Sequence, residues 1–255
     1  MSDNHQTLVG RAILVTGASG GIGAAIAERL AHEGATPIIH YSRDERSAHA
    51  LLERIGGKGH LVQADLSTTD GPTALWNRAV AAAGRVYGLV NNAGIRTECP
   101  IDASVEAWHA AWTSELQVNF LAAADLCKAA ILHFRGYKEG RIVNMSSRAG
   151  QRGYAAEALP YGATKAALIN LTKSIARSFG KDGITAVALA PGWVRTDMAK
   201  DFVARHGEAA AVGDIPIGSM AEPAEIAELV AFVLRPSQRS LNGATLDVNG
   251  GSYIR

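Results

Sequence analysis

A tyrosine and a lysine stand four positions apart in the motif YGATK, at Tyr161 and Lys165, and the chain then runs to Gly180 without another Gly or Pro. If this stretch is helical, both side chains lie on one face and can point into a common volume. A tyrosine hydroxyl can donate a proton to a developing oxyanion, but its ordinary pKa is about 10. A cation one turn away would lower that pKa, so the pair predicts a general acid and base, Tyr161, tuned by Lys165; the alternative is a packing pair on an ordinary helix.

A glycine-rich segment, TGASGGIG at 16–23, follows the first apolar run directly. Gly17, Gly21 and Gly23 permit a tight turn and a close approach of the backbone to a pyrophosphate. The helix expected after them would begin with free N–H groups and a positive dipole end, which suit phosphate. The segment therefore predicts nucleotide binding, and a purely structural turn is the alternative.

The end of the second apolar run, IIHYSRDE, indicates which nicotinamide cofactor is bound. An NAD site would place an acidic residue there to hold the ribose hydroxyls, and by register Tyr41 occupies that position. Ser42 and Arg43 follow, so a 2′-phosphate would meet a guanidinium rather than a carboxylate. This favours NADP(H), with NAD(H) as the alternative, because Arg43 could be a solvated loop charge beside Asp44 and Glu45.

The elements that would position these residues alternate along the chain. Helical patterns, among them a stretch from about Ser104 to His133, separate seven β-rich runs at 12–16, 36–41, 60–64, 86–91, 141–145, 184–189 and 245–249. This alternation predicts an α/β fold with a doubly wound, Rossmann-like parallel sheet of about seven strands and helices on both faces. We expect a single domain over 1–255, with the long irregular segment 191–221 as a substrate lid.

Composition excludes several classes of protein. The chain has 25 basic and 24 acidic side chains, a formal charge of +1, so we expect no nucleic-acid or anionic-membrane partner. Cys99 and Cys127 form no CxxC motif, and the histidines form no HExxH cluster, so no metal site or disulfide framework is expected. The polar start of the chain and the absence of a long apolar run predict a cytoplasmic protein.

The order and spacing of TGASGGIG, NNAG at 91–94 and YGATK resemble the short-chain dehydrogenase/reductases over essentially the full length. The likeness is strongest to the group of 3-oxoacyl-acyl-carrier-protein reductases and bacterial sugar or alcohol dehydrogenases. It implies a catalytic set of Asn119, Ser147, Tyr161 and Lys165. It implies cofactor contacts from Gly17, Ser19, Gly21, Ile22, Gly23, Asp65, Leu66, Asn91, Ala93, Gly94, Pro191, Gly192, Val194 and Thr196, together with Tyr161 and Lys165. Ser146 is the alternative to Ser147.

The resemblance implies hydride transfer between NADP(H) and a small carbonyl compound or secondary alcohol. Ser147 would steady the substrate oxygen, Lys165 would hold the nicotinamide ribose, and Asn119 would anchor a water that links Lys165 to solvent. It also implies a homotetramer or homodimer. A catalytically silent NADP-binding sensor or scaffold is the alternative function. The substrate stays open, and Arg96 is interpreted either as a partner for an anionic substrate or as an exposed loop arginine.

Overall fold

The computed structural model describes residues 7–255; the first part of the polar N-terminal segment, 1–6, lies outside the described residues. Seven strands form one sheet in the order β3-β2-β1-β4-β5-β6-β7, and every neighbouring pair is parallel. The strands are β1 (Ala12–Val15), β2 (Thr36–Tyr41), β3 (His60–Gln63), β4 (Val86–Asn91), β5 (Gly140–Met145), β6 (Ile184–Pro191) and β7 (Thr245–Val248). The predicted α/β fold with a doubly wound parallel sheet is confirmed.

The central strands are buried along their whole length because both faces of the sheet are covered. All residues of β1, β4, β5 and β6 are buried. The sheet order reverses at β1, which pairs with β2 on one side and β4 on the other. The loops that leave the carboxyl ends of these strands diverge to opposite faces and open a crevice there.

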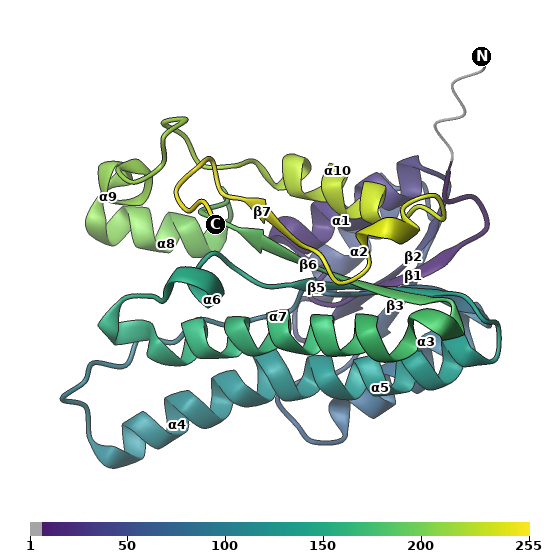
Figure 1. Cartoon of the computed structure of the whole chain (residues 1–255), viewed down its shortest axis with the longest axis horizontal. Coiled ribbons are helices and arrows are strands. Elements are labelled where there is room, and N and C mark those ends of the chain that lie inside the picture. Colours follow the sequence, from purple (N-terminus) through teal and green to yellow (C-terminus); the bar gives the residue numbers. More distant parts are fainter. Residues whose placement is uncertain (1–6) are drawn as a thin grey trace.

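Helices cover both faces of the sheet (Figure 1). One face packs against α1 (Gly21–His32), α2 (Glu45–Arg54) and α10 (Pro223–Leu234) through a core that includes Ile26 and Val230. The other face packs against α3 (Gly71–Ala83), α5 (Ala122–Arg135) and α7 (Leu159–Phe179). Short 3₁₀ helices at Ala156–Ala158, Gly180–Asp182 and Arg239–Leu241 complete the connections. The two cores fix the strand ends from which the candidate site projects.

The helical stretch expected from about Ser104 to His133 is not one regular helix. α4 (Val105–Glu115) passes into a π-helical turn, Leu116–Leu121, before α5 begins at Ala122. Asn119 is the buried residue of this turn. π-Turns inside helices are frequent at functional sites, because the extra residue redirects the side chains of that turn.

The segment after β6 is more helical than the sequence suggested. α8 (Asp197–His206) and α9 (Glu208–Val212) lie together at one end of the molecule and share a small apolar cluster with Trp193 and Met220 (Figure 1). The short helix α6 (Ala149–Arg152) follows β5. Within residues 7–255 no helix is long and apolar enough to span a membrane. The same part of the chain contains no group of three or more His, Cys, Asp or Glu residues able to hold a metal ion.

Candidate active site

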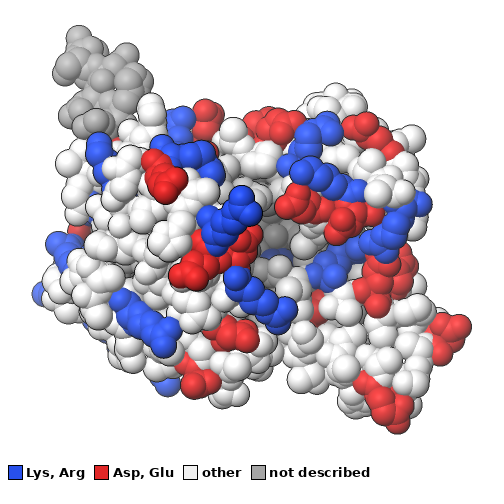
Figure 2. All heavy atoms as spheres, turned by 180° about the vertical axis from the view of Figure 1, so that it is seen from behind, with Lys and Arg blue, Asp and Glu red and all other residues white. Residues whose placement is uncertain are grey.

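A cleft of about 730 Å³ lies at the carboxyl ends of the central strands. In Figure 2 the surface is hollowed near the centre of the view, with acidic and basic side chains around the opening. Most of the residues implicated by the sequence line this cleft: Gly17, Ser19, Gly21, Ile22, Ser42, Arg43, Asp65, Leu66, Ala93, Gly94, Ser147, Tyr161, Lys165, Pro191, Gly192, Val194 and Thr196. Gly23, Tyr41, Asn91 and Asn119 are not among the lining residues.

The glycine loop is closed by contacts with the NNAG turn. Gly17 has a φ of +62°, and a Cβ there would lie 3.0 Å from the Cα of Ala93. Gly23 supports the loop from beneath, since its Cβ would overlap the carbonyl oxygen of Gly17 and lie 2.7 Å from Nδ2 of Asn92. α1 begins at Gly21 without a side-chain cap, which leaves its first N–H groups free toward the cleft.

Two residues that the sequence analysis missed tie this loop to the strand ends. Thr16 Oγ1 accepts the backbone N–H groups of Asn92 and Ala93, both at 2.9 Å. The Asn92 amide donates to the carbonyls of Thr16 and Gly17 at 2.9 and 3.2 Å. Asn91 points away into the core, where its amide donates to Asn144 Oδ1 at 2.8 Å. The NNAG motif therefore shapes the cleft as well as lining it.

His40 also escaped the sequence analysis, although alternation along β2 could have found it. The backbone N–H of Gly17 donates to its Nδ1 at 2.9 Å, and its Nε2 lies 3.2 Å from the carbonyl oxygen of Ala64. Burial lowers the pKa of His40 to about 4, so the ring is neutral at pH 7. Because successive side chains on a strand face opposite sides, Tyr41 points into the core instead, with its hydroxyl donating to Glu45 at 3.3 Å.

The outer end of the cleft offers polar groups suited to an adenosine phosphate. Ser42, Arg43 and Asp65 line it. Arg43 has no ion-pair partner within residues 7–255, whereas Asp44 is engaged as the N-cap of α2, accepting the Ser47 N–H at 2.9 Å. Hydrogen bonds from Ser67 hold the pKa of Asp65 below its ordinary value, and Arg43 acts in the same direction. The glycine cradle, the free N–H groups and this unpaired guanidinium fit a phosphorylated dinucleotide.

Tyr161 and Lys165 project into the cleft from the first turns of α7, whose start is set by Pro160 in the first turn. Lys165 Nζ donates to the carbonyl oxygen of Met145 at 2.8 Å and lies 5.6 Å from the centre of the Tyr161 ring. Ser146 Oγ donates to the carbonyl oxygen of Lys165 at 2.7 Å, which anchors α7 to β5. Ser147 lines the cleft with Tyr161, accepts the Ala149 N–H at 3.1 Å and acts to lower the Tyr161 pKa.

The pKa values differ from the tuning expected from the sequence. Burial raises the pKa of Tyr161 to about 12, and Ser147 offsets only part of this. Burial lowers the pKa of Lys165 to about 8, against the opposing attraction of Glu115. The net Tyr161 pKa is therefore above its ordinary value, because removal from water outweighs the opposing causes, and the lowering by Lys165 stays a prediction. Tyr161 is protonated near pH 7, which is the state needed to donate.

Asn119 lies behind the cleft with 1% of its surface exposed. Its Oδ1 accepts the N–H of Ile95 at 2.8 Å, and its Nδ2 donates to the Ile95 carbonyl at 2.9 Å and to Glu115 Oε2 at 3.0 Å. A Cβ on Gly94 would lie 3.2 Å from Asn119 Oδ1 and 3.3 Å from Lys165 Nζ, so both groups flank Gly94. The amide of Asn119 thus fixes the chain beside the lysine.

Glu115 is a further buried group that the sequence analysis overlooked. Its Oε1 accepts the Thr97 N–H at 2.6 Å, and burial raises the pKa of its carboxyl group. Its spacing of four residues before Asn119 places both on one helix face, and this was the available signal. Glu115 stabilises the charged form of Lys165 electrostatically and so belongs to the site.

The segment after β6 closes the other side of the cleft. Gly192 donates its N–H to the Val248 carbonyl at 2.9 Å, and Val194 is buried in the core. Thr196 packs against the glycine loop, where its methyl group would lie 3.4 Å from a Cβ on Gly21. Segments far apart in sequence thus meet over one cleft.

Comparisons with known proteins agree with this arrangement. A family model described as enoyl-(acyl carrier protein) reductase matches residues 17–253. The chain is 35% identical over 249 residues to the 3-oxoacyl-(acyl-carrier-protein) reductase of Vibrio cholerae, covering 98% of this chain and all of that protein. A short chain dehydrogenase from Burkholderia cenocepacia, solved in complex with NADP, matches with a TM-score of 0.85 at 36% identity, covering 96% of this chain and 98% of that one. The angucycline C-6 ketoreductase LanV, solved with bound NADP, matches with a TM-score of 0.86 at 30% identity, covering 96% of each chain.

Proposed function

The chain belongs to the short-chain dehydrogenase/reductase family, and we propose that it transfers hydride between NADP(H) and a small carbonyl compound or secondary alcohol, with Tyr161 as general acid and base. The observation that carries this proposal is the meeting of Ser147, Tyr161 and Lys165 in the cleft that the glycine loop also lines. A structural packing pair on α7 would not require a hydroxyl, a phenol and an ammonium around one opening.

The protein's own groups handle the charge and the proton. When bound, the nicotinamide supplies the hydride in reduction and accepts it in oxidation. Negative charge develops on the substrate oxygen during reduction, and Ser147 and Tyr161 donate hydrogen bonds to that oxygen. Tyr161 holds its proton until transfer, because burial raises the pKa of its hydroxyl to about 12. Lys165, anchored on Met145, stabilises the phenolate that transfer leaves.

The preference for NADP(H) over NAD(H) is supported by Ser42 and Arg43. Both line the outer cleft, and Arg43 has no carboxylate within ion-pair distance in the described part of the chain. A planar guanidinium pairs well with a phosphate. The solved complexes of the Burkholderia dehydrogenase and of LanV with NADP support the same preference. Gly17, Gly21 and the first turn of α1 would hold the pyrophosphate, and Pro191, Gly192, Val194 and Thr196 would border the nicotinamide.

Further proposals concern the assembly. Residues 1–255 would fold as one domain, with 191–221 as a lid over the substrate. Two copies or four would associate through the helices around Asn119 and Tyr161. Exposed leucines at 116, 121 and 159 support this interface. Light scattering on the purified protein tests the assembly, and a monomer would contradict it.

The test of the proposed function is turnover of NADPH with a panel of neutral carbonyl compounds. We expect Tyr161→Phe to lose roughly a hundredfold or more in kcat while binding NADPH as tightly as the parent, since only the transferable proton is removed. Tyr154→Phe, whose ring lies 5.7 Å from that of Tyr161, is the matched control and should keep most of the activity. Full activity of Tyr161→Phe would refute the mechanism. NADPH binding without turnover of any carbonyl compound, neutral or acidic, would indicate the silent sensor instead.

A further inference from the structure

Arg96 stands on the loop that follows the NNAG turn, and it is not the exposed loop arginine considered from the sequence. Its side chain is 7% exposed, yet it lines the cleft together with Tyr154 and Tyr161. Its guanidinium lies 5.4 Å from the centre of the Tyr154 ring, and the Tyr154 ring lies 5.7 Å from that of Tyr161. The Tyr154 ring therefore neighbours both this cation and the candidate proton donor.

The hydrogen-bonding capacity of Arg96 is largely unused. Within residues 7–255 its one hydrogen-bond partner is Glu98, whose Oε1 accepts from Nη1 at 2.9 Å. Its Nε is buried and has no partner in the described structure. A buried guanidinium with unpaired N–H groups carries a desolvation cost, and such groups in native proteins have an explanation in ligand binding, water or strain.

The carboxylates around Arg96 do not balance its charge. Glu98 is shared, because its Oε2 accepts from Arg205 of α8 at 2.6 Å, so this group of three keeps one net positive charge. Glu115 acts on Arg96 only at longer range, and its own oxygens are taken by Thr97 and Asn119. The cleft therefore holds a surplus of positive charge beside Tyr161.

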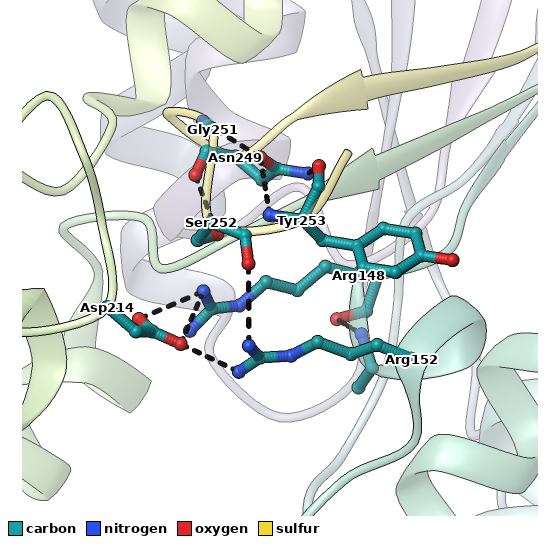
Figure 3. A network of polar contacts seen from close by, with 9 residues as sticks. Arg148, Arg152, Asp214, Asn249, Gly251, Ser252 and Tyr253 are labelled. Atoms are coloured by element: carbon teal, nitrogen blue, oxygen red, sulfur yellow. Dashed lines mark hydrogen bonds and ion pairs between the residues drawn. The ribbon is translucent and has the colours of Figure 1, made fainter. Parts of the chain in front are cut away.

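Arg148, the other buried arginine of the cleft, also shares one carboxylate with a second arginine, but it makes more hydrogen bonds to that carboxylate than Arg96 makes to Glu98. Its Nη1 donates to both carboxylate oxygens of Asp214 at 3.1 Å, and Arg152 joins the same carboxylate at 2.8 Å (Figure 3). Figure 3 shows both arginines pointing at Asp214. Arg148 thus has a structural role that accounts for its burial, whereas Arg96 does not.

We propose that Arg96 binds a carboxylate of the substrate, so that the compound reduced at Tyr161 is an oxo acid and the compound oxidised is a hydroxy acid. The planar fork of a guanidinium matches a carboxylate in geometry and charge. A short acid, with its carbonyl close to the carboxylate, suits a cleft in which Arg96 and Tyr161 both neighbour the Tyr154 ring. This inference rests on the proposed reductase function and specifies its substrate class.

The test compares an acid with its neutral ester. Acetoacetate and ethyl acetoacetate, and pyruvate and ethyl pyruvate, are reduced with NADPH by the parent and by Arg96→Gln. We expect the parent to prefer the acids, and Arg96→Gln to lose roughly a hundredfold in kcat/KM for the acids, since one partner of a buried charge pair is removed. The esters should change by less than about threefold. Arg96→Lys should recover part of the loss, because it keeps the charge without the fork.

Arg205→Gln is the matched control, since it removes the other cation on Glu98. If Arg96 only braced the loop against α8, both variants would weaken acids and esters alike, and the proposal would be overturned. A parent that prefers the esters would overturn it as well. Thermal melting of Arg96→Gln and Arg96→Lys establishes that each variant is folded.

Failure of the reductase function gives a different pattern. If neither the acids, the esters nor the neutral carbonyl panel are turned over, binding to the NADPH-loaded protein decides the matter. Acetoacetate that quenches the fluorescence of bound NADPH in the parent but not in Arg96→Gln supports the carboxylate site. The proposal is overturned if ethyl acetoacetate quenches the fluorescence as strongly as acetoacetate does, or if acetoacetate does not quench it.

Discussion

The side of the cleft formed by the ends of β1 and β2 and by the NNAG turn is held by main-chain groups, whereas the side formed by the loop after that turn, α6 and α8 is held by ion pairs. On the first side, Thr16, His40 and Asn92 each bond to backbone atoms of the glycine loop or the NNAG turn. On the second side, Glu98 joins Arg96 to Arg205, and Asp214 joins Arg148 to Arg152.

Because of this difference, the two sides tolerate different substitutions. A backbone cradle depends on residues at strand ends, and a Cβ added at Gly17 or Gly23 would collide with main-chain atoms. Ion pairs between loops and helices join side chains that can be exchanged without moving the sheet. We infer that the first side is committed to one type of ligand, and that the second side sets which substrate is used.

We expect the largest effect from Gly23→Ala, in the glycine loop of the first side. A Cβ at Gly23 would overlap the Gly17 carbonyl and lie 2.9 Å from the Cα of Ala18, so the loop must move. We expect loss of detectable NADPH binding in a fluorescence titration and a lower melting temperature. Gly20→Ala is the control: its φ is −161° and its Cβ would meet nothing within 4 Å, so its melting temperature should match the parent. Tight NADPH binding by Gly23→Ala would contradict the rigid cradle.

Glu115→Gln tests the buried carboxylate behind the cleft. An amide can accept only one of the N–H groups that Thr97 and Asn119 now donate, so the free energy of unfolding should fall by about 1–3 kcal/mol. Glu115 also raises the pKa of Lys165, which is about 8. Without that carboxylate the lysine loses its proton at lower pH, so the alkaline limb of the pH–rate profile should move to lower pH. Glu53→Gln, at an exposed site on α2, should leave the limb in place; an unmoved limb in Glu115→Gln would exclude the coupling.

Asp214→Asn tests the ion pairs of the second side. Arg148, with 5% of its side chain exposed, would keep its charge without a carboxylate, which should cost about 1–3 kcal/mol in thermal unfolding. Because Arg148 also lines the cleft, we expect KM for the carbonyl substrate to rise while NADPH affinity stays unchanged. Asp182→Asn removes a surface pair with Arg135 at 2.7 Å and should change neither quantity appreciably. Equal changes in unfolding free energy and KM in the two variants would mean that the ion pairs of Asp214 with Arg148 and Arg152 contribute no more than a surface pair.

Arg43→Gln returns to the first side, where one side chain does select the ligand. We expect NADPH affinity to fall about tenfold, or about 1.4 kcal/mol, and NADH affinity to stay constant. Arg46→Gln, at an exposed position in the first turn of α2, is the control and should leave both affinities unchanged. Parallel titrations with the two cofactors measure the effect, and an unchanged NADPH affinity would remove Arg43 from the 2′-phosphate site.

Much of the fold was predictable because its signals are local. All seven strands lie where the apolar runs indicated, with differences of one or two residues at their ends. The π-turn at Leu116–Leu121 was not predictable, since residues of a π-turn have the same composition as those of an α-helix. Tyr41 was expected at the cofactor, but its ring lies in the core and His40 lines the cleft, because strand alternation was not carried through to the end of β2.

The sequence by itself determined the family, the parallel sheet and the candidate functional residues Tyr161, Lys165 and the glycine loop. These features follow from strand positions and motif spacings, which depend only on residues close together in the sequence. Only the tertiary structure decided that Arg96 is buried with unpaired N–H groups, that Ser146 is engaged by α7, and that Tyr161 keeps its proton. Burial and charge pairing depend on residues up to about a hundred positions away, as with Glu98 and Arg205. The pKa of a group and the hydrogen bonding of a guanidinium depend on this three-dimensional environment, which a local sequence pattern does not specify.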